Sequence, residues 1–480
     1  MGAIDLAIVG AYLIGITLFG LHFRSKQRSL RDYFLADRNV PWWAIALSIV
    51  AAETSTLTII STPGLAYDTN LAFLQLVFGY LIARVIISII FIPQYFRGQL
   101  LTAYQLIERR FGPRLRSLTA GLFLITRAAA EGVRVYAISI VVGIAIGTGD
   151  LASIAIITLL TLIYTFEGGM RAVIWTDVVQ MAIYVGGTLV GFFVLLHLIP
   201  GGWPVVEAVA TAGHKFRIFD FSFDLSKTYT FWAGVIGGTF LTTASHGTDQ
   251  LMVQRLLSAR DERQAKLALL SSGVAVLFQF SLFLLIGVLL FVYYRVPSVL
   301  FGKSDRIFPT FIVEEMPRGI AGLLIAAILA AAMSNLSAAL NSLSASTIVD
   351  FYLRRRPNAD EAARVRVSRL ATTFWAAVLF VLAVISRHAE RVLETGLKIA
   401  SVTYGAMLGA FLLGTLTKRA NEQGTMIGMA CGLGLELYLW TATAVPLTWY
   451  VAIGTITTFV IGYAASVFFT PKTGLVEARA

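Results

Sequence analysis

Charge is the scarcest property of this sequence. Only 14% of its 480 residues are Asp, Glu, Lys or Arg, whereas 57% are hydrophobic and the mean hydropathy is +0.77. A soluble chain of this length needs much more charge to cover its surface. The composition therefore predicts an all-α integral membrane protein made of long apolar segments.

Cysteine and histidine are almost as rare. The single cysteine, Cys431, excludes an intramolecular disulfide, and five scattered histidines offer no zinc-binding spacing. Neither Gly-x-Ser-x-Gly nor His-Glu-x-x-His occurs, and no nucleophile stands beside a base. We therefore do not expect an enzyme.

Thirteen stretches are apolar and long enough, or nearly so, to cross a bilayer at about 1.5 Å per residue. The predicted spans are 3–22, 42–67, 72–97, 117–147, 151–167, 173–199, 229–254, 264–294, 319–350, 366–386, 391–416, 424–442 and 445–469. The first lacks a basic segment and a small-residue cleavage site, so we expect a retained span and not a signal peptide.

Lysine and arginine are unevenly divided among the predicted loops. With the N-terminus outside, 25 basic residues fall in cytoplasmic loops and the C-terminal tail, and 9 fall outside. Positive loops stay in the cytoplasm. This predicts a multi-pass protein of the inner (plasma) membrane, with the N-terminus outside and the C-terminus cytoplasmic. The net charge of +11 then reflects topology, and no nucleic-acid partner is expected.

Polar residues interrupt the second span, where residues 51–58 read Ala-Ala-Glu-Thr-Ser-Thr-Leu-Thr. Hydroxyl and acidic side chains compete with a helix for its own backbone groups. In hydrocarbon, freed backbone groups are tolerated only where they line a cavity or are buried in protein. We expect a broken helix that binds something small and polar. The alternative is an ordinary helix whose hydroxyls bond to neighbouring helices.

A second polar face lies in span 319–350. Ser337 and Asn341 follow Ser334 by three and seven residues, so the three share one helix face. Oxygen ligands with at most one carboxylate suit a weakly bound monovalent cation. A seam of small residues for helix packing would explain the alanines equally well.

Ionisable residues also fall within predicted spans, where they are costly and point to a site or pathway. They are Arg84, Arg127, Arg134, Lys398, Glu53, Glu131, Asp177, Glu394 and Glu436. Because Arg127, Glu131 and Arg134 are spaced four and three apart, they could instead neutralise one another on one helix.

Several motifs resemble those of the sodium/solute symporter family. Residues 168–180 read Gly-Gly-Met-Arg-Ala-Val-Ile-Trp-Thr-Asp-Val-Val-Gln and residues 248–257 read Thr-Asp-Gln-Leu-Met-Val-Gln-Arg-Leu-Leu. Residues 32–36, Asp-Tyr-Phe-Leu-Ala, are similar too, although Asp37 stands where relatives usually have glycine. The resemblance runs from about Asp32 to Arg419.

The resemblance implies a LeuT-type core of two inverted repeats of five spans, here 42–199 and 229–416, inside a single transporter domain covering 1–480. An extra N-terminal span, 3–22, would precede the core, and two C-terminal spans, 424–469, would follow it.

The resemblance also implies the ligands of a sodium ion. The main site would use the carbonyl groups of Ala51, Thr54 and Ala331 with the side chains of Ser334 and Asn335. Asn335 departs from the family, which usually has a hydroxyl there. A second sodium near Asp177 and Ser337 is possible by similarity but is not favoured, because Ala338 replaces another hydroxyl.

The solute site is less defined. Similarity to sugar and sialic-acid transporters, with the polar pattern, gives the candidates Glu53, Ser55, Thr56, Thr58, Gln75, Arg127, Arg134, Thr242, Ser245, His246 and Tyr404. Glu53 would repel a carboxylate unless it is protonated or paired with an arginine. A zwitterion or a polyhydroxylated acid would suit this set.

The sequence thus predicts a sodium-coupled symporter that imports a small polar organic solute by alternating access. Its partners would be the solute, Na⁺ and the lipid bilayer, with a monomer as the working expectation. The alternatives are a sodium-independent or channel-like transporter, or a solute sensor on the same scaffold.

Overall fold

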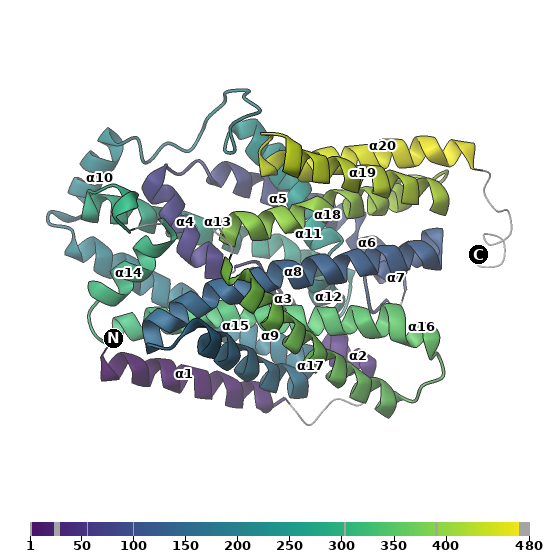
Figure 1. Cartoon of the computed structure of the whole chain (residues 1–480), viewed down its shortest axis with the longest axis horizontal. Coiled ribbons are helices and arrows are strands. Elements are labelled where there is room, and N and C mark those ends of the chain that lie inside the picture. The colour runs from purple at the N-terminus through teal and green to yellow at the C-terminus, as the bar shows by residue number, and fades with distance from the viewer. Residues whose placement is uncertain are drawn as a thin grey trace.

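The computed structural model describes residues 2–23, 29–54, 56–98, 100–301, 304–388 and 392–469, and the regular elements in these ranges are helices. Most of them run along the long axis of the molecule (Figure 1). The longer helices are α1 (Ala3–Leu21), α3 (Trp42–Glu53), α4 (Thr56–Asp68), α5 (Leu74–Ile90), α8 (Pro113–Ile146), α9 (Asp150–Leu198), α10 (Gly202–Ala212), α11 (Gly238–Gly247), α13 (Glu262–Tyr294), α15 (Ile320–Ser346), α17 (Glu361–Ile385), α18 (Val392–Leu416), α19 (Glu422–Ala442) and α20 (Tyr450–Phe468).

Short helices connect or extend these elements. They are α2 (Leu30–Leu35), η2 (Ala36–Arg38), α6 (Ile92–Phe96), α7 (Tyr104–Phe111), η3 (Ala233–Gly237), α12 (Gln250–Leu257), η4 (Ser298–Phe301), η5 (Ser304–Arg306), α14 (Ile307–Glu314), η6 (Thr347–Tyr352), α16 (Leu353–Arg355), η7 (Ser386–His388) and η8 (Leu447–Trp449). Two of them, η3 and η6, have the wider π-helical winding.

Helices occupy all thirteen stretches predicted to span the membrane. Among the described residues, however, only eight helices are long and apolar enough to cross by themselves, or nine if a bent pair counts as one span. One reason is that α9 is divided by a kink at Gly169, where φ is +54°, and its first part offers only a shorter apolar stretch, Leu151–Ile163. A glycine adopts this conformation without steric cost. Thirteen spans and the two repeats remain predictions.

The bent pair is α3 and α4, at the stretch where the sequence predicts a break. Helix α3 ends at Glu53, Thr54 is extended with ψ of 100°, and the two helix axes differ by 60°. The predicted break is confirmed, and the alternative of an uninterrupted helix is wrong. A second break separates α11 from α12, where the Asp249 carboxylate accepts a hydrogen bond from the N–H of Leu251 (2.9 Å).

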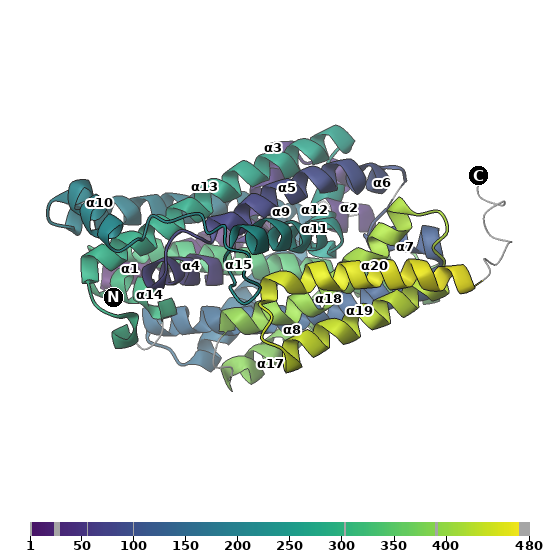
Figure 2. The ribbon, with the colours of Figure 1, turned by 90° about the horizontal axis from the view of Figure 1, so that it is seen from above.

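Helix α15 lies at the centre of the molecule. In its most apolar stretch, 94% of the residues are buried. It packs against α9, α8, α1 and α3, and its many alanine and serine residues allow these helices to come close. The last three helices, α18, α19 and α20, lie side by side along one flank in both views (Figures 1 and 2).

Candidate functional site

Two of the predicted sodium ligands, Thr54 and Asn335, meet between the broken helix and α15. Asn335 donates from its Nδ2 to the carbonyl oxygen of Thr54, at 2.9 Å. Thr54 also accepts a hydrogen bond at its hydroxyl from Gln279 of α13. All five predicted ligands are at most 2% exposed: Ala51, Thr54, Ala331, Ser334 and Asn335.

The oxygen atoms at this point suit a small cation. Because α3 stops at Glu53, its last carbonyl groups lack the partners that a continuing helix would provide. The Oδ1 atom of Asn335 is buried, and no hydrogen-bond partner for it exists among the described residues. If the amide turned over, Oδ1 would face the carbonyl oxygen of Thr54, and a cation between the two would stabilise that arrangement.

Asp177, the predicted centre of a second sodium site, is already bonded on all sides. Its carboxylate accepts hydrogen bonds from Ser334 (2.6 Å) and Ser48 and pairs with Arg255 at 2.8 Å. Ser337 lies one turn away and donates to the carbonyl oxygen of Ser334 (2.9 Å). Ser334 thus links Asp177 to Ser337, and Arg255 lies where a cation beside Asp177 would need to be.

Glu53, at the end of α3, pairs with Arg84 of α5. The guanidinium is 1% exposed and also donates to Ser272 of α13 (3.2 Å) and to the carbonyl oxygen of Tyr80 (3.1 Å). His246 of α11 places its Nε2 3.4 Å from the Glu53 carboxylate. The charge of Glu53 is therefore neutralised, which removes the expected repulsion of a carboxylate solute.

The arginines of α8 are neutralised as well. Arg127 pairs with Glu131 (3.0 Å) and with Asp249 at the second break, and it donates to the hydroxyl of Tyr404 (3.0 Å). Tyr404 in turn donates to Asp249 (2.8 Å). Arg134 pairs with Glu131. The expected local neutralisation is confirmed, and it extends to α12 and α18.

Gln75 is a predicted solute ligand whose amide bonds to backbone groups. Its Nε2 donates to the carbonyl oxygens of Ala72 (3.1 Å) and Tyr229 (3.4 Å), and its Oε1 accepts from the N–H of Asp220 (3.0 Å). The side chain is fully buried. In this conformation Gln75 holds a loop against the start of α5.

The other predicted solute ligands lie around the two breaks. Thr242 is buried on α11, and Ser245 bonds to His246 Nδ1 at 2.9 Å. Thr58 is half-buried in α4. Ser55 and the side chain of Thr56 lie outside the described residues.

Sequence reasoning missed several partners in these networks. It noted Arg84 as a charge within a span but could not assign Glu53 to it, and it placed Arg255 in a loop. Ser48 and Gln279 gave no signal, because single polar residues in apolar spans are common. Charged residues within the predicted spans indicated that polar networks exist. Their bonding partners can be identified only from the fold.

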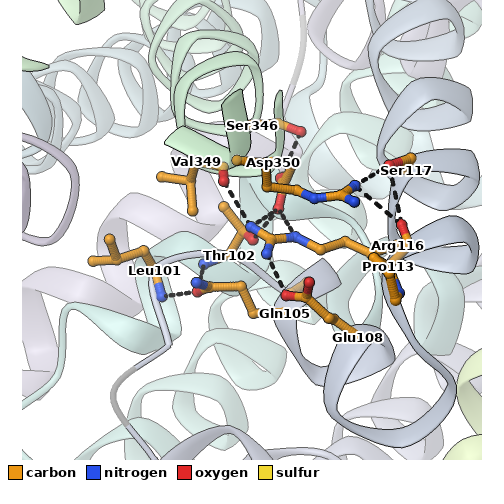
Figure 3. A network of polar contacts seen from close by, with 12 residues as sticks. Leu101, Thr102, Gln105, Glu108, Pro113, Arg116, Ser117, Ser346, Val349 and Asp350 are labelled. Atoms are coloured by element: carbon orange, nitrogen blue, oxygen red, sulfur yellow. Dashed lines mark hydrogen bonds and ion pairs between the residues drawn. The ribbon is translucent and has the colours of Figure 1, made fainter. Parts of the chain in front are cut away.

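A further buried network ties α8 to the end of α15 (Figure 3). Arg116 donates from Nε to Asp350 (2.8 Å) and from Nη2 to the carbonyl oxygen of Val349 (2.7 Å). Thr102 and Ser346 also donate to the Asp350 carboxylate, at 2.8 Å and 2.9 Å. This carboxylate is fully bonded, so the network supports the scaffold and is not an open site.

Comparison with known proteins agrees with this architecture. The human sodium/iodide cotransporter is 30% identical over 460 residues, 93% of this chain and 70% of that protein. The sodium/sialic acid symporter of Aliivibrio fischeri is 29% identical over 480 residues, 98% of this chain and 94% of that protein.

Solved structures of transporters superpose on this fold. A sodium-coupled sialic acid symporter, solved substrate-bound and outward-open, superposes with a TM-score of 0.91 at 28% identity, covering 98% of this chain and 99% of the other. Mhp1, a nucleobase-cation-symport transporter with the LeuT-type fold, superposes at 0.59 and 15% identity over 90% of this chain and 93% of that one, a likeness of fold alone.

A family model extends these likenesses over both helix breaks, the Asp177 motif and the central helix. It matches residues 33–432 and describes the sodium:solute symporter family. The sequence resemblance is confirmed: this chain belongs to the sodium:solute symporter family, whose coupling ion is sodium.

Proposed function

We propose that this chain imports a small organic anion together with one sodium ion by alternating access. The observation that carries the proposal is the ion pair between Glu53 and Arg84, which leaves no net negative charge at the break. The named solutes of two relatives, iodide and sialic acid, are anions, which supports the same chemistry here.

Sodium would supply the attraction for the anion. The arginines near the breaks, Arg84 and Arg127, are paired with carboxylates. A cation held by Thr54 and Asn335 would then be the uncompensated positive charge beside the solute. Charges a few ångströms apart interact strongly where water is excluded. Each ligand would therefore raise the affinity for the other by the same factor.

The same cation would couple binding to the conformational change. Its ligands belong to two pieces, the end of α3 and α15, and a cation between them favours the state in which they are close. A ligand shifts a conformational equilibrium only through such a difference in affinity. We place a single sodium here, because Arg255 occupies the Asp177 carboxylate.

The finer sequence predictions belong to this proposal. We propose two inverted repeats of five spans, a bilayer partner, a monomer and an inner-membrane orientation with a cytoplasmic C-terminus. The described part of the chain also has no cluster of three or more His, Cys, Asp or Glu side chains. Because the relatives are transporters, we propose transport and no enzymatic activity.

A thermal-shift screen tests the solute class. Purified protein would be heated with monocarboxylates, sugar acids, amino acids or neutral sugars, each in sodium and in potassium. Ligands of the folded state raise its stability by mass action, by about 2.7 kcal/mol at a hundredfold excess over Kd. An organic anion that stabilises only in sodium supports the proposal. Stabilisation by neutral sugars alone, or equally in potassium, contradicts it.

A further inference from the structure

A cavity of about 260 Å³ opens where α6 and α7 meet the last turns of α18, away from both helix breaks. Figure 2 shows α6 and α7 toward one end of the molecule. The distribution of loop charges assigns this end to the cytoplasm. The cavity is separate from the sodium and solute site.

Three arginines line this cavity, Arg97, Arg109 and Arg110, and no acidic residue lines it. In the described ranges, no carboxylate lies within ion-pair distance of any of the three. Arg97 has one long hydrogen bond to Gln94 (3.5 Å), and Arg110 donates to the carbonyl oxygen of Thr417 (3.1 Å).

Arg116, a few residues away, differs from these three arginines because it has carboxylate partners. That guanidinium binds Asp350 and Glu108 and is buried. A guanidinium fork matches a carboxylate or a phosphate in two-point contacts. The three cavity arginines therefore present unused donors of the kind that bind a phosphate.

Besides Gln94, Gly414 and Thr415, the rest of the lining is apolar. Phe411 and Ile107 are at most 1% exposed, and Leu106 is half-buried. The Arg110 guanidinium lies over the ring of Phe111, 4.9 Å from its centre, and burial lowers its pKa. Leu416, at the end of α18, is 57% exposed, so apolar surface continues beside the cavity.

We propose that this cavity binds an anionic phospholipid of the cytoplasmic leaflet, with its phosphate between Arg97, Arg109 and Arg110 and part of an acyl chain against Leu106 and Leu416. Basic pockets between membrane helices on the cytoplasmic side suit such head groups. The lipid would join α6, which continues α5, to α18. Helix α5 carries Arg84, and α18 carries Tyr404.

Native mass spectrometry of the full-length protein tests the proposal. Protein in detergent would receive phosphatidylglycerol or phosphatidylcholine, and bound lipids would be counted. The test variant is R97Q/R109Q, and the control is R355Q/R356Q, which removes the same charge from exposed arginines of the α16 region. Arg97 and Arg109 are exposed, so folding should be retained, and gel filtration would confirm it.

We expect the wild type and the control to retain one phosphatidylglycerol, and R97Q/R109Q to lose it. The single variant R109Q should be intermediate. None of the proteins should retain phosphatidylcholine. Equal phosphatidylglycerol binding by R97Q/R109Q and the control would overturn the proposal. A competition arm uses inorganic phosphate at millimolar concentration. Displacement of the lipid by phosphate alone would assign the cavity to a soluble anion, which also overturns it.

Discussion

The neighbours of Glu53 change how its charge must be interpreted. In the sequence it is an acid in a proposed anion site, which argues against an anion. In the structure Arg84, 31 positions later, neutralises it, and Ser272 and Tyr80 hold that arginine in place. The pairing could not be predicted, because nothing in the local pattern links α3 to α5.

This pairing predicts strong coupling between two substitutions. Glu53→Gln leaves the buried Arg84 without its carboxylate, and Arg84→Met leaves Glu53 beside His246 without its arginine. Breaking a buried ion pair in this way costs about 3–5 kcal/mol. The double variant should recover most of that loss, because both charges are gone. Thermal unfolding in detergent measures the effect. Additive losses in the double variant would show that the pair is not coupled.

Ser334→Ala should weaken sodium activation more than it changes folding. The hydroxyl is a proposed sodium ligand, and its loss should raise the sodium concentration for half-maximal uptake by about tenfold, equivalent to about 1.4 kcal/mol. The control is Ser342→Ala on the same helix, where the buried hydroxyl donates to the carbonyl oxygen of Ala339 (3.1 Å). An equal effect of both substitutions would count against Ser334 as a ligand.

Among the helices, the sequence predicts the breaks and kinks that polar residues or glycines mark. The break after Glu53 was predictable because acids and hydroxyls interrupt an apolar run, and the kink at Gly169 because two glycines follow Glu167. The division of α9 into two parts was predictable for the same reason, because its backbone is non-helical at Gly169. The register of neighbouring helices also cannot be read from periodicity.

The contact between α19 and α20 is an example of a helix register that the sequence does not predict. Small residues recur every fourth position on both helices, and the chains approach backbone to backbone. Gly428 faces the carbonyl oxygen of Thr458 and the backbone of Gly462, and an added Cβ would overlap them. Gly434, on the same helix, faces open space.

This geometry predicts opposite results for two alanine substitutions. Gly428→Ala should destabilise the helix pair by about 1–3 kcal/mol, as overpacking does. Gly434→Ala should be neutral or stabilising by up to about 1 kcal/mol, because alanine favours a helix. Unfolding temperatures of the two variants give the comparison. A Gly428→Ala protein as stable as Gly434→Ala would refute the close contact.

For the whole molecule, the distribution of charge predicts orientation. In a Cys431→Ala background, Ser226→Cys lies in the exposed loop before η3 and Arg356→Cys follows α16. A membrane-impermeant maleimide should label Ser226→Cys in intact cells and Arg356→Cys only after permeabilisation, because the basic loops are cytoplasmic. The reverse labelling pattern would invert the proposed topology.

At this scale the family and the all-helical class were predictable from motifs and polarity, whereas the sodium ligands remain a prediction. The exact set of spans, the partners of the buried charges and the arginine-lined cavity needed the fold, since each depends on helices distant in sequence.

The most direct test of the account is to measure radiolabelled sodium and the solute entering the same proteoliposomes. If one sodium ion is coupled to one solute, each enters only with the other, in equal numbers, and potassium does not replace sodium. Sodium entry without solute, or solute entry that is unchanged in potassium, would contradict it.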